Sequence, residues 1–183
     1  MVNRNLRKKA IYLDRDGVIN SAISKNGLPF PPSSVDQVII LPGVEEGLKL
    51  LRDAKFEIIV VTNQPEVSRG QILKETVEEI NFFLGVKLGI KHFYVCYHDD
   101  SDKCLCRKPA PGLLINSAKN LGISLSRSYM VGDRWKDIVA GQRAGCRCFF
   151  IDYKYKLKYP EKPYITVKSL VDVAKIIRSS EIK

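Results

Sequence analysis

Short apolar runs, rich in β-branched and aromatic residues, alternate along this chain with stretches in which apolar residues recur at helical spacing. The runs predict strands, and the stretches predict helices. A chain that alternates strand and helix in this way buries its strands in a parallel sheet, with crossover helices packed on the faces. The sequence therefore predicts an α/β fold, a Rossmann-like parallel sheet flanked by helices.

The predicted elements follow one another with short connections. The strands are 9–14, 56–61, 93–97, 129–131, 148–151 and 165–167. The helices are one opened by Pro42-Gly43-Val44, then about 72–88 and 111–121, one through Ile138 and Ala144, and one from Ser169. The proline-rich stretch 27–34 is expected to be an irregular loop.

The length of 183 residues suits one domain with a proper core and is short for two. The chain shows no internal repeat and no linker, which predicts a single domain spanning 1–183. Only 47 residues separate Asp14 from Thr62, and much of that segment is already assigned to strand and helix. We therefore expect no large cap domain.

The formal net charge of +10 suits an anionic ligand. The cations are scattered, and the densest stretch, 154–159, mixes lysine with tyrosine. Such a stretch can follow a nucleic-acid backbone, but it is more often a solvated loop, so we do not expect nucleic acid as a partner. No apolar run approaches the roughly 20 residues of a membrane span, and no signal peptide is evident, so a cytoplasmic location is expected. We also expect the protein to be a monomer.

Three of the five cysteines crowd into one short stretch together with a histidine. Three thiols and an imidazole within eleven residues suit a tetrahedral zinc site with no open position, which predicts a structural Zn²⁺ and a zinc-binding loop. The predicted ligands are Cys96, His98, Cys104 and Cys106. The alternative is four unliganded side chains. Cys146 and Cys148 are expected to be core residues.

Acidic side chains stand at the carboxyl ends of two predicted strands. Asp14 and Asp16 follow the first strand, and Asp133 follows Gly132 after another. Ligands of parallel sheets bind at this edge, and oxygen donors grouped there suit Mg²⁺. The alternative for each is a turn or helix cap, which we prefer only for Asp137, as a structural or supporting residue.

Two further positions suit phosphate binding. Thr62 ends a predicted strand with a hydroxyl and backbone amides in the same crevice, and Lys108 precedes a helix opened by Pro111. A cation near a helix amino terminus makes an anion site. Alone, each residue would be a strand-end cap or a solvated lysine.

The ordered set of Asp14-x-Asp16-Gly17, Thr62, Lys108 and Gly132-Asp133 resembles the phosphatases of the haloacid dehalogenase-like superfamily. Three longer motifs resemble the D-glycero-D-manno-heptose 1,7-bisphosphate phosphatases, with histidinol-phosphate phosphatases as close relatives. They are 13–20 (LDRDGVIN), 61–64 (VTNQ) with Arg69-Gly70, and Cys106-Arg107-Lys108-Pro109-x-Pro111-Gly112. The resemblance implies removal of the heptose 7-phosphate, a step toward nucleotide-activated heptose for surface polysaccharide.

The resemblance also implies a role for each motif residue. Asp14 would attack phosphorus, and Asp16 would give a proton to the leaving oxygen and then take one from water. Mg²⁺ would bind the Asp14 carboxylate, the Asp16 carbonyl and the Asp133 carboxylate. Thr62 and Lys108 would hold phosphoryl oxygens, and the expected substrate contacts are Asn63, Gln64, Arg107, Lys108 and Arg134.

The chain departs from the heptose phosphatases where substrate is recognised. The stretch Pro65-Glu66-Val67-Ser68 replaces the usual Ser-Gly-Ile-Ala, the zinc loop is short, and Arg134 stands where lysine is common. A histidinol-phosphate phosphatase or a nucleic-acid 3′-phosphatase is the alternative enzyme. A zinc-stabilised module that binds phosphate without cleaving it is the alternative outside enzymes.

Overall fold

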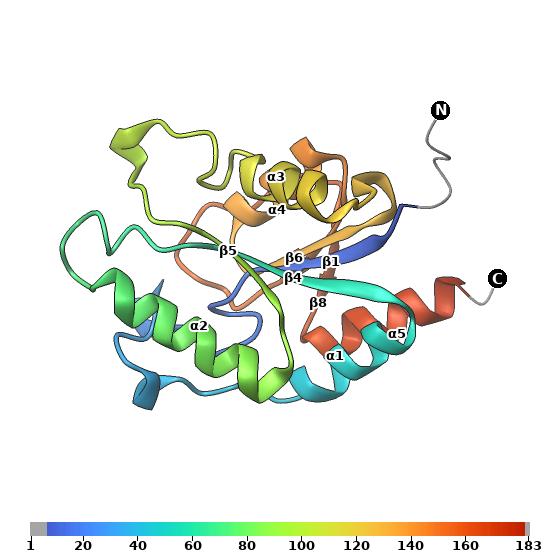
Figure 1. The fold of residues 1–183 in the computed structure, drawn as a ribbon, viewed down its shortest axis with the longest axis horizontal. Helices are drawn as coiled ribbons and strands as arrows, with labels where there is room; N and C mark the ends of the chain where they lie inside the picture. Colours follow the sequence, from blue (N-terminus) through green and yellow to red (C-terminus); the bar gives the residue numbers. More distant parts are fainter. Residues whose placement is uncertain (1–6, 182–183) are drawn as a thin grey trace.

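A parallel sheet of six strands runs through the middle of the molecule (Figure 1), in the order β5-β4-β1-β6-β7-β8. The computed structural model describes residues 7–181. The strands are β1 (Lys9–Leu13), β4 (Phe56–Asn63), β5 (His92–Cys96), β6 (Tyr129–Gly132), β7 (Arg147–Ile151) and β8 (Ile165–Val167). The predicted fold class and all six predicted strands are confirmed, with bounds that differ by at most two residues.

Helices cover both faces of this sheet because its strands are apolar on both sides. In β1, Ile11 and Leu13 pack toward one face, while Ala10 and Tyr12 pack toward the other. Helices α1, α2 and α5 cover the first face, and α3 and α4 cover the second (Figure 1). Their bounds are Val44–Asp53, Lys74–Leu88 and Leu170–Glu181 for the first face, and Gly112–Leu121 and Trp135–Ala144 for the second.

Strand β1 lies between β4 and β6 in the sheet, so its carboxyl end lies between theirs. Ile11 pairs in parallel with Ile58 of β4 and with Tyr129 of β6. The carboxyl ends of these three strands therefore lie side by side, as expected from the polar residues that follow them. β4 runs on to Asn63, so Thr62 lies inside the strand and not at its end.

The segment between β1 and α1 carries a small hairpin, which corrects the expectation of an irregular loop at 27–34. β2 (Ile23–Lys25) pairs antiparallel with β3 (Leu28–Phe30). The two linking residues, Asn26 and Gly27, have φ of 55° and 81°, the conformation that an Asn-Gly hairpin turn requires. Apart from this hairpin and a 3₁₀ helix at Val35–Gln37, the segment between β1 and α1 contains no further helix or strand.

No helix within 7–181 has both the length and the apolar character that a bilayer crossing requires.

Candidate active site

The turn after β1 is built around Gly17, which delivers Asp14 to the edge of the sheet. Gly17 has φ of 89°, and the amide of Gly17 donates to the carbonyl of Asn20 at 2.7 Å. A Cβ at this position would collide with the carboxylate of Asp133. Position 17 therefore requires glycine for two reasons: its backbone has a positive φ, and the Asp133 carboxylate leaves no room for a Cβ.

Lys108 is buried at the centre of the site. Its Nζ lies 2.8 Å from Asp14 Oδ1, 2.6 Å from Asp137 Oδ1 and 2.8 Å from the carbonyl oxygen of Val61. Burial disfavours the ammonium charge, but the carboxylates of Asp137 and Asp14 outweigh burial and raise the pKa of Lys108. Lys108 is thus a fixed cation directly beside the predicted nucleophile.

Three carboxylates meet beside this lysine. Oxygens of Asp14, Asp133 and Asp137 all lie within 4.8 Å of one another, and all three residues are buried. Burial raises the pKa of Asp133, and neither of its carboxylate oxygens has a hydrogen-bond partner within residues 7–181. Buried acceptors without donors, gathered with further carboxylates, are what a divalent cation requires, so these residues fit Mg²⁺.

Asp16 points away from that cluster and into a network of its own. Its two oxygens accept hydrogen bonds from Arg15, from Asn20 at 2.8 Å and from Gln64 at 2.8 Å. Burial would raise the pKa of Asp16, but the charge of Arg15 and these hydrogen bonds lower it. The carboxylate of Asp16 is therefore stabilised in its ionised form.

Sequence reasoning missed Arg15, which is fully buried and also donates to Asn81 of α2 at 3.0 Å. Its only sequence signal was its place between two acids.

The polar residues at the end of β4 and just after it differ in their surroundings, since two are buried supports and one lines the cavity. The Gln64 amide bridges Asp16 and the Thr62 hydroxyl, and both Gln64 and Thr62 are buried. Asn63 lines the cavity, but its amide exchanges two hydrogen bonds with the backbone of Lys108, at 3.0 and 3.1 Å. These contacts hold the turn that carries Lys108, whose bond to Pro109 is cis.

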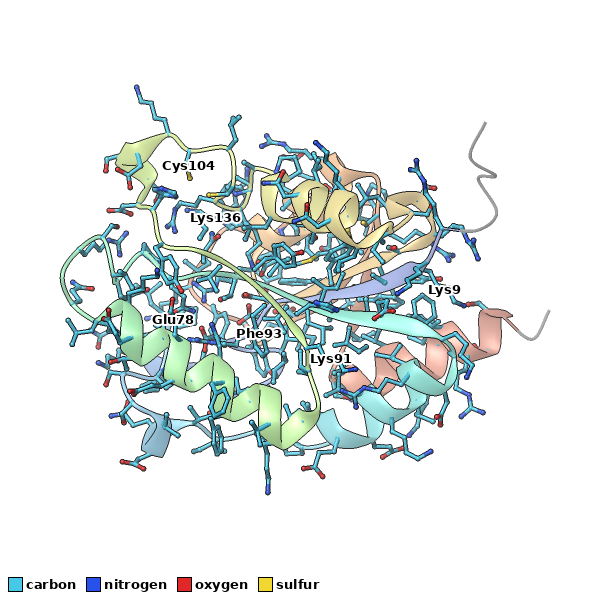
Figure 2. All side chains as sticks on the ribbon, viewed as in Figure 1. Lys9, Glu78, Lys91, Phe93, Cys104 and Lys136 are labelled. Carbon is cyan, nitrogen blue, oxygen red and sulfur yellow. The ribbon has the colours of Figure 1, made fainter. Side chains whose placement is uncertain are left out.

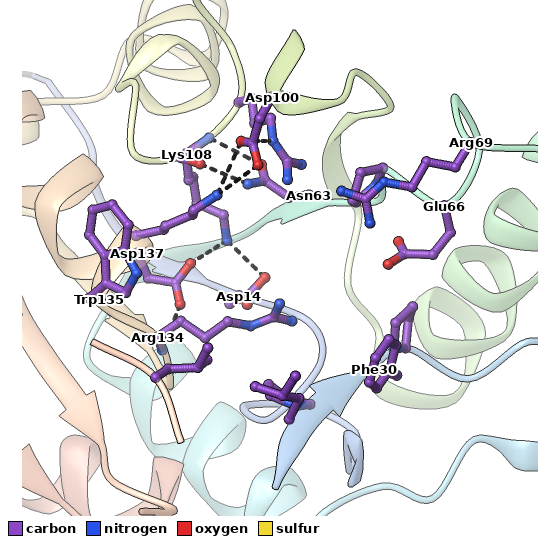
Figure 3. Close-up of a pocket in the computed structure, with 17 residues that line it drawn as sticks. Asp14, Phe30, Asn63, Glu66, Arg69, Asp100, Lys108, Arg134, Trp135 and Asp137 are labelled. Carbon is purple, nitrogen blue, oxygen red and sulfur yellow. Dashed lines mark hydrogen bonds and ion pairs between the residues drawn. The ribbon is translucent and has the colours of Figure 1, made fainter. Parts of the chain in front are cut away.

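A cavity of about 270 Å³ opens above Asp14 and Lys108 (Figure 3). Arg107 and Arg134, both predicted substrate contacts, line it. Arg107 Nε donates to Asp100 at 2.8 Å, and Lys136 lies 3.1 Å from the same carboxylate. Arg134 lies 3.8 Å from Asp133, and its buried Nε has no hydrogen-bond partner in the described part of the chain. Arg107, Arg134 and Lys136 thus supply positive charge on the cavity wall, while Asp14 and its neighbouring acids lie at the floor beside Lys108. Neither Asp100 nor Lys136 was predicted from the sequence as a site residue.

The four predicted zinc ligands meet at the end of β5, which supplies Cys96, and in the loop from β5 to α3, where Cys104 is labelled in Figure 2. Cys106 Sγ lies 3.2 Å from Cys96 Sγ, 3.4 Å from Cys104 Sγ and 3.3 Å from His98 Nδ1. Tetrahedral Zn–S bonds of about 2.3 Å place sulfur atoms about 3.8 Å apart, so this cluster fits a zinc ion after a small expansion. The predicted ligand set is therefore assembled.

The family model of haloacid dehalogenase-like hydrolases matches residues 33–145. A curated relative from Helicobacter pylori (strain ATCC 700392 / 26695), a D-glycero-β-D-manno-heptose-1,7-bisphosphate 7-phosphatase, is 30% identical over 93% of this chain and 98% of its own length. A relative from Photorhabdus laumondii, named for the α anomer, is 31% identical over 92% of this chain and 96% of its own.

A solved structure shows the same similarity. The D,D-heptose 1,7-bisphosphate phosphatase from B. bronchiseptica, complexed with magnesium and phosphate, superposes with a TM-score of 0.82 at 27% identity. The match covers 94% of this chain and 99% of that one.

Proposed function

The chain belongs to the haloacid dehalogenase-like hydrolases and is a phosphoric monoester hydrolase, and from that membership we propose that it releases the 7-phosphate of D-glycero-D-manno-heptose 1,7-bisphosphate. The observation that carries this proposal is the buried Lys108–Asp14 pair at the floor of the cavity, with Asp133 and Asp137 beside it. Relatives named for this substrate match nearly the full chain and support the choice of sugar.

Asp14 is assigned as the nucleophile. Lys108 Nζ and the backbone amide of Arg15 both contact Oδ1, at 2.8 and 2.9 Å, which holds this oxygen in place. Oδ2 is then the oxygen that attacks phosphorus, giving an aspartyl-phosphate as the sugar oxygen leaves. Lys108 offsets the negative charge that gathers between the carboxylate and the phosphoryl group.

Asp16 is assigned to proton transfer. It must protonate the departing sugar oxygen and then deprotonate the water that hydrolyses the aspartyl-phosphate. Its contacts with Arg15 and Gln64 stabilise the carboxylate, which is the form that takes a proton from water. Delivery of a proton to the sugar requires Asp16 to turn from Arg15 and Gln64 toward the cavity and to take up a proton from solvent there before the sugar oxygen leaves, because its present contacts keep it ionised.

Asp14 and Asp133 are the side chains that would hold Mg²⁺, with the carbonyl of Asp16 as the further ligand inferred from the resemblance. When bound, the ion supplies positive charge that lets a dianionic phosphate approach a carboxylate. Arg107, Arg134 and Lys136 at the cavity mouth would take the second phosphate of the substrate. A structural Zn²⁺ on the Cys₃His cluster would fix the loop that carries Arg107 and Lys108.

Phosphate release from a substrate panel tests this proposal. The panel contains both anomers of the heptose bisphosphate, histidinol phosphate and 3′-phosphorylated DNA, each with and without Mg²⁺. We expect Mg²⁺-dependent cleavage of a heptose bisphosphate ahead of the other compounds. A preference for histidinol phosphate or DNA would refute the substrate.

The variant Asp14→Asn tests the mechanism. It keeps an oxygen for Lys108 but removes the nucleophile, so turnover should fall by roughly a thousandfold or more while the fold is retained. Activity near that of the unmodified protein would refute the mechanism even if the substrate were correct.

A further inference from the structure

Glu66 places a carboxylate on the cavity wall across from Arg134 and Trp135 (Figure 3). It stands in the stretch Pro65-Glu66-Val67-Ser68, directly after the residues that support Asp16 and Lys108. In Figure 3 its carboxylate points into the cavity, with the Arg69 side chain drawn above it and the Phe30 ring below it. The mechanism proposed above makes no use of this acid.

The loop holds Glu66 in a defined place. Its carbonyl oxygen accepts hydrogen bonds from the amides of Gln71 at 2.8 Å and Ile72 at 3.3 Å. The preceding carbonyl, that of Pro65, accepts from the Arg69 amide at 3.1 Å and the Ser68 hydroxyl at 3.0 Å. The backbone around Glu66 is therefore fixed on both sides, and the side chain reaches the cavity from a rigid base.

No cation of the described residues is shown to hydrogen-bond the buried Oε2 oxygen of the Glu66 carboxylate. Oε2 is shielded from solvent and has no hydrogen-bond partner within residues 7–181. The charge of Arg69 interacts with that of Glu66, but the two hydrogen bonds of its guanidinium, of 2.6 and 3.0 Å, go to Asp99. A shielded acceptor without a donor is unfavourable, and a ligand that brings donors removes that cost. The terminal torsion of glutamate is soft, so either oxygen can turn to meet such a donor.

The charge of Glu66 also decides which part of a substrate fits next to it. A phosphate there would meet the negative charge of Glu66, which Arg69 offsets only in part because Asp99 shares that arginine, whereas Arg107, Arg134 and Lys136 offer positive charge elsewhere on the wall. Given the sugar phosphatase function proposed above, on which this assignment rests, we propose that Glu66 accepts hydrogen bonds from neighbouring hydroxyl groups of the sugar. Glu66 thereby directs the second phosphate toward the arginines and sets the orientation of the substrate.

The test compares Glu66→Gln and Glu66→Ala with Glu79→Gln, a control on the exposed surface of α2. Each is assayed on the heptose bisphosphate and on p-nitrophenyl phosphate, which has no sugar hydroxyl. Loss of hydrogen bonds to a charged acceptor predicts a KM for the bisphosphate raised about 10- to 100-fold in Glu66→Ala, with a smaller rise in Glu66→Gln. The loss on p-nitrophenyl phosphate should be clearly smaller, and Glu79→Gln should behave as the unmodified protein.

Equal losses on both compounds would show a structural role for Glu66 and overturn the proposal, as would an unchanged KM for the bisphosphate. A selective loss on glucosamine 6-phosphate or histidinol phosphate, with sugar phosphates unaffected, would identify an ammonium ligand instead. Thermal unfolding of each variant shows whether the fold is retained.

The substrate assignment can fail independently. If the protein cleaves other sugar phosphates but not the heptose bisphosphate, the same comparison on the best of them still decides the role of Glu66. If it cleaves p-nitrophenyl phosphate but no sugar phosphate, the hydroxyl subsite is refuted.

Discussion

Replacing Lys108 with methionine is the perturbation for which the structure makes the largest quantitative prediction. Methionine keeps most of the buried volume but removes the cation between Asp14 and Asp137. Both carboxylates would then be buried beside Asp133 without their shared ammonium. We expect a large loss of folding free energy together with loss of catalysis.

The magnitude follows from the contacts. Besides its contact with the Val61 carbonyl, Nζ makes two charge-assisted hydrogen bonds to carboxylates, of 2.8 and 2.6 Å, and each is worth about 1.5–3 kcal/mol. Their sum of about 3–6 kcal/mol agrees with the cost of about 3–5 kcal/mol for removing one partner of a buried ion pair. The free energy of unfolding should therefore fall by about 3–5 kcal/mol.

Urea unfolding in EDTA, followed by circular dichroism, measures this change. The control is Lys49→Met, which removes an exposed lysine paired with Asp53 on α1 and should leave the unfolding midpoint nearly unchanged. A loss below about 1 kcal/mol for Lys108→Met would refute the view that Lys108 is the main counterion of the acidic cluster.

Two further predictions test the turn and the zinc loop. Gly17→Ala should abolish phosphate release and lower the unfolding temperature, because a Cβ meets the Asp133 carboxylate and φ is 89°; wild-type activity in this variant would contradict the close approach. Burial raises the pKa of Cys146 and of Cys148 to about 12, so at pH 8 roughly one molecule in 10⁴ carries either thiolate. After zinc is removed with a chelator, iodoacetamide should label Cys104 and Cys106 but not Cys146 or Cys148, as read by mass spectrometry. Labelling of Cys104 that does not depend on the chelator would argue against a bound zinc.

The strands were predictable because burial on both faces makes each of them a short, nearly continuous apolar run, as in Ile58–Val61 of β4. Because parallel strands end at the same edge of a sheet, the sequence alone predicted that the polar residues after these runs, Asp14 and Asp133 among them, would lie close together. The zinc ligands were predictable for a local reason, since all four lie within eleven residues.

The hairpin at 23–30 was not predicted because its strands are three residues long and its second strand contains Pro29. The available signal was Asn26-Gly27, which favours a two-residue turn even between short strands. The turn is further held by the amide of Lys156, which donates to the carbonyl of Gly27 at 3.0 Å. That contact joins segments more than a hundred residues apart, and no local pattern carries it.

The role of Arg15 was hidden for the same reason. An arginine between two acids at a strand end reads as a solvated turn residue, and most arginines are exposed. Its burial depends on Asn81, a helix residue 66 positions away that accepts from the guanidinium. Long-range pairing of this kind separates Asp16 from the other acids, although Asp14 and Asp16 follow the same strand.

The buried charges of the site explain why these acids had to be separated. Asp16 is balanced by Arg15, so that pair adds no net charge next to the cavity. When all three are ionised, Asp14, Asp133 and Asp137 carry one negative charge more than the two cations that face them, Lys108 and Arg134, and burial raises the pKa of Asp14 and of Asp133. A divalent cation would reverse the sign of that excess, and a phosphate dianion would then be attracted to the floor of the cavity. Had Asp16 joined the same cluster without Arg15, the excess would be two negative charges, and a divalent cation would only cancel it. The arginine inside the Asp14-Arg15-Asp16 motif thus allows the site to hold four carboxylates and still attract its anionic substrate.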